Sequence, residues 1–362
     1  MNYRIDIFKH QDIPGDKWNE LVESSRSATP FSLYQYNSVF ADDDPFYIVV
    51  TDPVSDLWQA GISARIKGRL PVAGNLFASV VSETSALVRT DSGIKGQKLK
   101  EILYKELISY SKKIGAMQVL LNHWSREEEK ETLVSAGFIT SANPTFEINT
   151  GRPYNEIFAN YSDTCRNKVR KAKKNNVKIE IRSGDISTER TEIIESLSKS
   201  TFRRAYQRNT EVTMQIKRAE FYRSLFRNMP ENATLGFASA GTGGPVSFAV
   251  VLTGGNRSIY YRGGSDIEGN RRTAASNLLI DAFIESTARK GISLFDMGGV
   301  PMDPAENNPA YGLLKFKESF GGDYKIYYSG IFICSKNKAI FFNNFINNRL
   351  FMQIYNRFKP VS

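Results

Sequence analysis

The chain has 362 residues, a length that favours two domains over a single core. Hydrophobic residues make up 41% and aromatic residues 12%, which excludes a globally disordered protein. The net charge of +10 suits a polyanionic partner such as RNA, a nucleotide-sugar diphosphate, an acidic carrier protein or a membrane surface, although ordinary solubility explains it equally well.

Localisation signals point to the cytoplasm. The apolar runs are far shorter than the ~20 residues of a membrane span, and the N-terminus lacks the apolar segment of a signal peptide. Two cysteines, Cys165 and Cys334, are too few for a disulfide framework or a cysteine-rich zinc site. We therefore expect a cytoplasmic protein, with peripheral contact to the inner membrane face as an option.

Both halves of the chain alternate predicted strands and helices. Strand patterns cover 3–7, 45–51, 57–66, 117–121 and 145–148, then 177–182, 233–240, 246–253, 258–263, 292–297 and 324–334. Helical patterns cover 95–113 and 125–135, then 153–175, 188–206, 215–227, 274–290 and 310–320. The sequence therefore predicts a mixed α/β fold with similar element order in residues 1–150 and 151–335, followed by a C-terminal helix at 336–362.

A basic segment precedes the first strand of the second half. Residues 162–178 hold seven lysines and arginines and one acidic residue. On a helix, Arg166, Arg170 and Lys173 share one face, which could bind phosphates. A solvated helix face is the alternative interpretation.

Several reactive sites are missing from the sequence. There is no Walker A loop and no G-x-S-x-G motif, and neither His10 nor His123 has a metal-binding spacing. Cys165 has no histidine placed to act as its base. What remains is chemistry that depends on positioning and charge stabilisation, and acyl transfer fits because the acceptor amine is itself the nucleophile.

Five short motifs of the second half stand in the order found in one protein family. They are RNKVRKAK at 166–173, YRGGSD at 261–266, SNLL at 276–279, DMGG at 296–299 and FKESFG at 316–321. Over about residues 155 to 330 the chain resembles the FemABX peptidyltransferases and the related FemAB/BioF2-like acetyltransferase domains of the GNAT superfamily. The first half resembles them only in element order.

The resemblance implies tandem GNAT-like domains, each a mixed sheet flanked by helices. It implies transfer of an aminoacyl group from aminoacyl-tRNA to an amine of a peptidoglycan precursor, with no tightly bound cofactor or metal. The long coiled-coil hairpin of some members is absent, and relatives without it include sugar N-acyltransferases. The alternatives are therefore an acyl-CoA or acyl-carrier-protein dependent N-acyltransferase on an amino sugar in surface-polysaccharide synthesis, or a non-enzymatic RNA- or polyanion-binding protein.

The resemblance also suggests residue roles. Lys317 matches a family lysine near the acyl carbonyl, where it would stabilise the developing oxyanion; a surface lysine that covers an apolar helix face is the alternative. Asp296 would orient or deprotonate the attacking amine, or else cap nearby backbone groups. The expected substrate-binding residues are Arg166, Arg170, Lys173, Tyr261, Arg262, Arg271, Arg272, Ser276 and Phe316.

The loop that precedes the helix predicted at 274–290 departs from ordinary acetyl-CoA enzymes. Alanines stand where those enzymes have the glycines of an R/Q-x-x-G-x-G/A turn, so a close approach of the backbone to a pyrophosphate is less favoured. Arg271 and Arg272 could hold phosphate through their side chains instead.

Overall fold

The computed structural model describes residues 3–69, 74–90, 95–126, 129–208, 217–241 and 243–340. The chain forms two compact units, Met1–Ala142 with Ile326–Ser362, and Asn143–Lys325. Independent domains at 1–150 and 151–335 stay a prediction. The predicted C-terminal helix begins at residue 336 and continues to 340, and its remainder lies outside the described residues. No helix in the described ranges is long and apolar enough to span a bilayer.

The first unit is a mixed sheet with helices. Its strands follow the order β1 (Arg4–Lys9), β2 (Phe46–Thr51), β3 (Trp58–Lys67), β4 (Ser79–Ser82), β6 (Gln118–Arg126) and β13 (Asp323–Ile333), with β5 (Leu87–Val88) paired to β3. Its helices are α1 (Gly15–Glu23), α2 (Tyr34–Ser38), α3 (Lys95–Lys113) and α4 (Lys130–Ser135), with short 3-10 turns at Pro30–Ser32 and Ala41–Asp43. β4 and β6 are parallel, whereas β1–β2, β2–β3, β3–β4, β3–β5 and β6–β13 are antiparallel pairs. Leucines of α3, including Leu103 and Leu107, pack with Ile48 and Ile62 in the core.

The second unit repeats this plan. Its strands follow the order β7 (Ile139–Asn149), β12 (Leu294–Asp296), β11 (Arg257–Ser265), β10 (Pro245–Gly254), β9 (Ala233–Ser239) and β8 (Lys178–Ser183). Its helices are α5 (Tyr154–Ala159), α6 (Asp163–Lys174), α7 (Thr188–Arg208), α8 (Ala219–Asn228), α9 (Ile267–Thr273), α10 (Ala275–Arg289) and α11 (Pro309–Glu318). Here β11 and β12 are the parallel pair. The mixed α/β class predicted from the sequence is confirmed.

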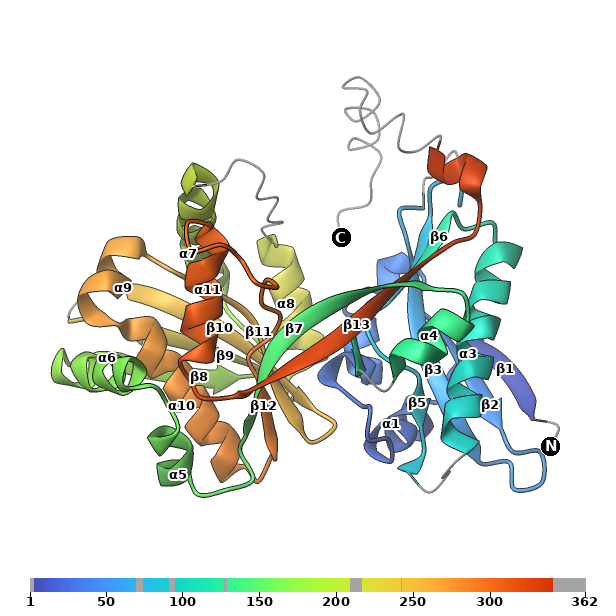
Figure 1. The fold of residues 1–362 in the computed structure, drawn as a ribbon, viewed down its shortest axis with the longest axis horizontal. Coiled ribbons are helices and arrows are strands. Elements are labelled where there is room, and N and C mark those ends of the chain that lie inside the picture. The colour runs from blue at the N-terminus through green and yellow to red at the C-terminus, as the bar shows by residue number, and fades with distance from the viewer. Residues whose placement is uncertain are drawn as a thin grey trace. The chain divides into compact units, whose positions relative to one another are not determined.

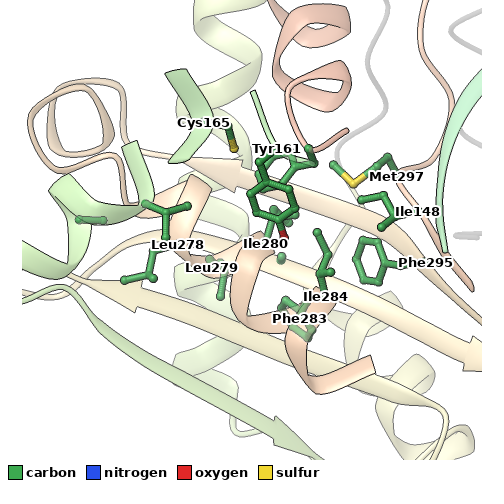
Figure 2. Close-up of a cluster of buried hydrophobic side chains, with 14 of the residues drawn as sticks. Ile148, Tyr161, Cys165, Leu278, Leu279, Ile280, Phe283, Ile284, Phe295 and Met297 are labelled. Atoms are coloured by element: carbon green, nitrogen blue, oxygen red, sulfur yellow. The ribbon is translucent and has the colours of Figure 1, made fainter. Parts of the chain in front are cut away.

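The core of the second unit forms around α10. Its apolar residues recur every three or four positions and so face the sheet together. Leu279 and Phe283 lie so close to Gly236 of β9 that a Cβ there would stand 2.8 Å and 2.6 Å from their side-chain carbons. Figure 2 shows these side chains in the same buried cluster as Phe295 and Met297, which come from β12 and the loop that follows it. This packing holds the end of β12 in place.

The two halves exchange their last strands. β7 is the last strand of the first half, yet it pairs with β12 of the second unit. β13 is the last strand of the second half, yet it pairs with β6 of the first unit. Figure 1 shows β7 in green and β13 in red as the two strands through which the chain passes between the units. Each sheet is therefore completed by a strand from the other half of the sequence.

Two predicted helix boundaries were wrong. The helix predicted at 153–175 is two helices, because Ser162 caps the start of α6 by accepting a hydrogen bond from the amide of Cys165 at 3.2 Å. The helix predicted at 125–135 begins only at Lys130, because β6 runs on to Arg126.

Candidate active site

The candidate site lies where two parallel strands separate. β11 and β12 pair only from Arg257–Leu294 to Ile259–Asp296, after which β11 continues to Ser265 and β12 ends. A β-bulge follows the separation, since Val250 of β10 pairs with Arg262 and Val251 with Tyr260. Bulges re-aim side chains next to functional sites. Backbone groups of β11 beyond Ile259 therefore lack a described strand partner on the β12 side.

Asp296 ends β12 and is fully buried. Its Oδ1 accepts hydrogen bonds from the Thr145 hydroxyl at 2.6 Å and from the Gly298 amide at 2.8 Å. Its Oδ2 accepts one from Arg257 Nη1 at 3.1 Å. Burial raises the pKa of Asp296, while Arg257 and the two hydrogen bonds oppose that rise. Because the carboxylate is fully buried, a substrate amine does not reach it in this conformation.

The loop after Asp296 requires glycine at position 298. Gly298 has a φ of +73°, and a Cβ there would stand 2.8 Å from the carbonyl oxygen of Tyr260. The loop is bonded to β7, because the amide of Met297 donates to Phe146 O at 2.9 Å and that of Val300 to Pro144 O at 2.8 Å. Gly299, the residue after Gly298 in this loop, accepts a hydrogen bond from Lys317 through its carbonyl oxygen.

Lys317 brings a buried cation to this loop from α11. Its side chain is 7% exposed, and Nζ donates a hydrogen bond to Gly299 O at 2.9 Å. Nζ also lies 5.5 Å from the ring centroid of Tyr260. Burial lowers the pKa of Lys317 to about 8, although the charge of Asp296 acts in the opposite direction. A buried lysine poised near neutral pH is the kind of group that stabilises charge or transfers a proton.

Tyrosine 260, rather than its predicted neighbour, accompanies Lys317. Tyr260 packs against the buried core of the second unit, and burial raises its pKa to about 12. Tyr261 and Arg262 lie beside α8 instead: the Tyr261 ring is 6.4 Å from that of Phe221, and the Arg262 guanidinium is 5.3 Å from the Tyr261 ring. Arg262 Nε is buried without a hydrogen-bond partner in the described residues. The bulge explains why strand alternation did not predict this arrangement.

Phe316, the neighbour of Lys317 in α11, is half-buried. It packs on the core, with its ring 5.4 Å from that of Phe320. This contact anchors the helix that carries Lys317.

The three basic residues predicted on α6 behave differently. Arg166 donates to the backbone carbonyls of Ala159, at 2.6 Å, and Tyr161, and it pairs with Asp163, so it fastens the start of the helix. Arg170 and Lys173 are exposed, each 6.0 Å from the ring centroid of Phe158. Arg166 is therefore engaged in local structure, whereas Arg170 and Lys173 remain accessible.

The end of α6 lies beside the end of α9. Lys171 Nζ donates to the carbonyl of Arg271 at 3.5 Å, and Asn175 Nδ2 donates to the carbonyl of Arg272 at 3.5 Å. The side chains of Arg271 and Arg272 are exposed. Two segments a hundred residues apart thus form one basic surface, defined here as Arg170, Lys171, Lys173, Arg271 and Arg272.

Ser276 stands at the start of α10. Its amide donates to Asn270 Oδ1 at 2.8 Å, and its hydroxyl contacts that of Ser247 at 2.8 Å. Ala274, just before the helix, has a φ of +58° and is buried, as is Ala275. The first turn of α10 is therefore partly capped by protein groups.

Cys165 is fully buried in the same core, and Asn277 Nδ2 lies 3.7 Å from its sulfur. Burial raises the pKa of the thiol, the opposite of what an activated nucleophile needs. Neighbouring cations therefore do not make it a thiolate. In the described ranges, no group of His, Cys, Asp and Glu residues could hold a metal ion.

Sequence reasoning missed Thr145, Glu147, Tyr260 and Arg257. Arg257 is 5% exposed and bridges Glu147, at 3.1 Å, and Asp296. Thr145 and Glu147 lie on β7, outside the five motifs. The one indication in the sequence was Glu147, an acidic residue within the apolar strand β7.

Comparison with known proteins agrees with this geometry. Residues 159–317 match the family described as the acetyltransferase (GNAT) domain. The crystal structure of FemX has 13% identity and a TM-score of 0.72, covering 93% of this chain and 99% of FemX. L-PGS from Bacillus licheniformis has 11% identity and a TM-score of 0.55, covering 96% of each chain.

A tandem GNAT protein from the clavulanic acid biosynthesis pathway has 11% identity and a TM-score of 0.55, covering 92% of this chain and 99% of that one. No curated protein sequence matches the chain. The tandem GNAT-like fold predicted from the sequence is confirmed, and the resemblance to FemAB-like proteins is supported by both kinds of match. The family match over residues 159–317 and the FemX-like fold together support an acyltransferase.

Proposed function

We propose that the protein transfers an aminoacyl group from aminoacyl-tRNA to an amine of a peptidoglycan precursor. The observation that carries the proposal is the basic surface next to the first turn of α10. It offers five cations to a polyanionic donor, and arginine and lysine bind phosphates through charge-assisted hydrogen bonds. The FemABX resemblance supplies the donor and acceptor classes.

The first turn of α10 favours this donor over CoA. A CoA pyrophosphate would need free amides at a helix N-terminus. Here the amide of Ser276 is taken by Asn270, and buried Ala274 and Ala275 carry Cβ atoms where a close approach would be needed. Phosphate contacts would then come from the side chains of Arg271 and Arg272.

Lys317 would provide the main chemical assistance. The amine attacks the carbonyl carbon of the aminoacyl ester, and the carbonyl oxygen becomes an oxyanion. The ammonium of Lys317, which is mostly charged at pH 7 because its pKa is about 8, would stabilise that oxyanion. The C–N bond forms, the ester C–O bond breaks, and the proton lost by the amine ends on the released tRNA hydroxyl. Asp296 would hold the loop in place, and its negative charge would favour the charged form of Lys317.

An acyl-CoA or acyl-carrier-protein dependent N-acyltransferase on an amino sugar is the second candidate. The GNAT family match favours it, since that family is described as an acetyltransferase.

A binding titration at several salt concentrations tests the choice, with charged tRNA, uncharged tRNA and CoA as ligands. We expect the charged tRNA to bind most tightly, with an affinity that falls steeply with salt. Saturable CoA binding with weak, unselective tRNA binding would reject the proposal in favour of the second candidate.

A further inference from the structure

We propose that Thr145 and Arg257 are positioning residues for Lys317. They fix the loop from Asp296 to Gly299, which carries both the carbonyl that holds the ammonium and the carboxylate that stabilises its charge. The inference rests on the proposed role of Lys317, but it assigns function to two residues outside the family motifs. One of them comes from β7, the strand contributed by the other half of the chain.

Thr145 joins the two ends of the turn. Its hydroxyl lies 2.6 Å from Asp296 Oδ1 and 2.9 Å from the carbonyl oxygen of Gly298, and its side chain is 1% exposed. One hydroxyl thus contacts both the carboxylate and the residue just before the Gly299 acceptor. Removing it would leave the turn without its only described side-chain hydroxyl contact.

Arg257 fixes the other carboxylate oxygen. Its guanidinium lies between Glu147 and Asp296, at 3.1 Å from each, and all three side chains are at most 12% exposed. Arg257 pairs with both Glu147 and Asp296, and this keeps the Asp296 carboxylate oriented. Loss of any one of the three would leave a buried charge with too few partners. A planar guanidinium spans two carboxylates in a way that a lysine ammonium does not.

A purely structural role would stabilise the fold without affecting Lys317. The geometry distinguishes the two cases, because both contacts end on the loop that receives Lys317 Nζ at 2.9 Å. If the loop loosens, the ammonium loses its acceptor and the nearby negative charge while staying buried. The pKa of Lys317 should then fall, since burial lowers it and Asp296 is the group that opposes the fall.

The test is an NMR titration of lysine side chains in the full-length protein, with Lys317 assigned by its loss in Lys317→Met. We expect Thr145→Val to lower the titration midpoint of Lys317, and Thr145→Ser, which keeps the hydroxyl, to restore it. Arg257→Lys should also lower the titration midpoint of Lys317. This variant provides the test if Thr145→Val does not fold. No substrate is needed, so the outcome is independent of the donor and acceptor.

Thr191→Val is the matched control. Thr191 is also fully buried in the second unit, but its hydroxyl donates to the carbonyl of Thr188 at 2.7 Å, within its own helix α7. The titration midpoint of Lys317 in Thr191→Val should equal that in the wild type. The inference is overturned if the folded Thr145 and Arg257 variants titrate like this control. The proposed function fails separately, if Lys317→Met retains acyl transfer.

Discussion

At the residue scale, burial of Lys317 lowers the stability of the fold and brings the pKa of the lysine closer to neutral pH. Lys317 is 7% exposed and its ammonium donates to the backbone carbonyl of Gly299, so the ammonium loses much of its hydration. Burial therefore lowers the pKa of Lys317 from 10.5 to about 8, against the opposing effect of the Asp296 charge. At 1.36 kcal/mol for each pH unit, the charged side chain destabilises the fold by about 3 kcal/mol at neutral pH.

This cost predicts a pH dependence of stability. Between pH 8 and 10.5 the unfolded chain binds a proton at Lys317 that the folded protein has released, so the free energy of unfolding should rise with pH in that window. Below pH 8 the full penalty is present. In urea unfolding, the stability of the wild type relative to Lys317→Met should be lower at pH 7 than at pH 10.5 by about 3 kcal/mol. A relative stability that does not change with pH would contradict the buried, charged lysine.

The sequence predicted one side of this site and missed the other. Lys317 and Asp296 stand in motifs that could be recognised without a structure. Thr145 lies 151 residues before Asp296 and Arg257 lies 39 before it, so no local spacing connects them. The YRGGSD motif indicated Tyr261, whereas Tyr260 is the tyrosine that lies beside Lys317, and the bulge between β10 and β11 is not visible in the motif.

At the element scale, the exchange of β7 and β13 is the organising feature. Each strand completes the sheet of the unit formed mainly by the other half of the chain. Periodicity predicted most of the strands, because each has its own apolar pattern. It could not predict their exchange, because partner choice depends on contacts far apart in sequence. The predicted boundary at residue 150 separates β7 from the site that it supports.

Fragments test the role of β7. Residues 151–325 lack the strand and leave Arg257 and Asp296 without Glu147 and Thr145. We expect fragment 139–325 to unfold cooperatively on heating and fragment 151–325 to lack a cooperative transition, because it has lost a strand and part of a buried charge network. Calorimetry of the two fragments measures this. Equal, cooperative transitions would show that β7 is dispensable.

At the scale of the whole molecule, part of the excess positive charge is concentrated on one surface. Many charged side chains are paired, for example Arg182 and Arg190 with Glu180. The basic surface formed by α6 and α9 instead presents exposed cations from two segments. The sequence indicated Arg170, Lys173, Arg271 and Arg272 in two separate segments, and the fold brings them together with Lys171.

Salt dependence tests this surface. Each phosphate contact that is lost should flatten the plot of log affinity against log salt by roughly 0.7 to 1. The double variant Arg271→Ala, Arg272→Ala should therefore bind tRNA more weakly, with a slope shallower by about 1 to 2. The control Arg289→Ala, Lys290→Ala removes the same charge from the exposed far end of α10 and should leave the slope unchanged. Equal slopes for both double variants would reject a localised phosphate contact.

The most direct measurement is single-turnover transfer of labelled amino acid from a pool of charged tRNAs to peptidoglycan precursor, by wild type and Lys317→Met. The account predicts transfer by the wild type and a rate about 100- to 1000-fold lower for the variant, as for loss of one oxyanion contact, with unchanged tRNA affinity. Transfer by Lys317→Met at the wild-type rate would contradict the central role of the buried lysine.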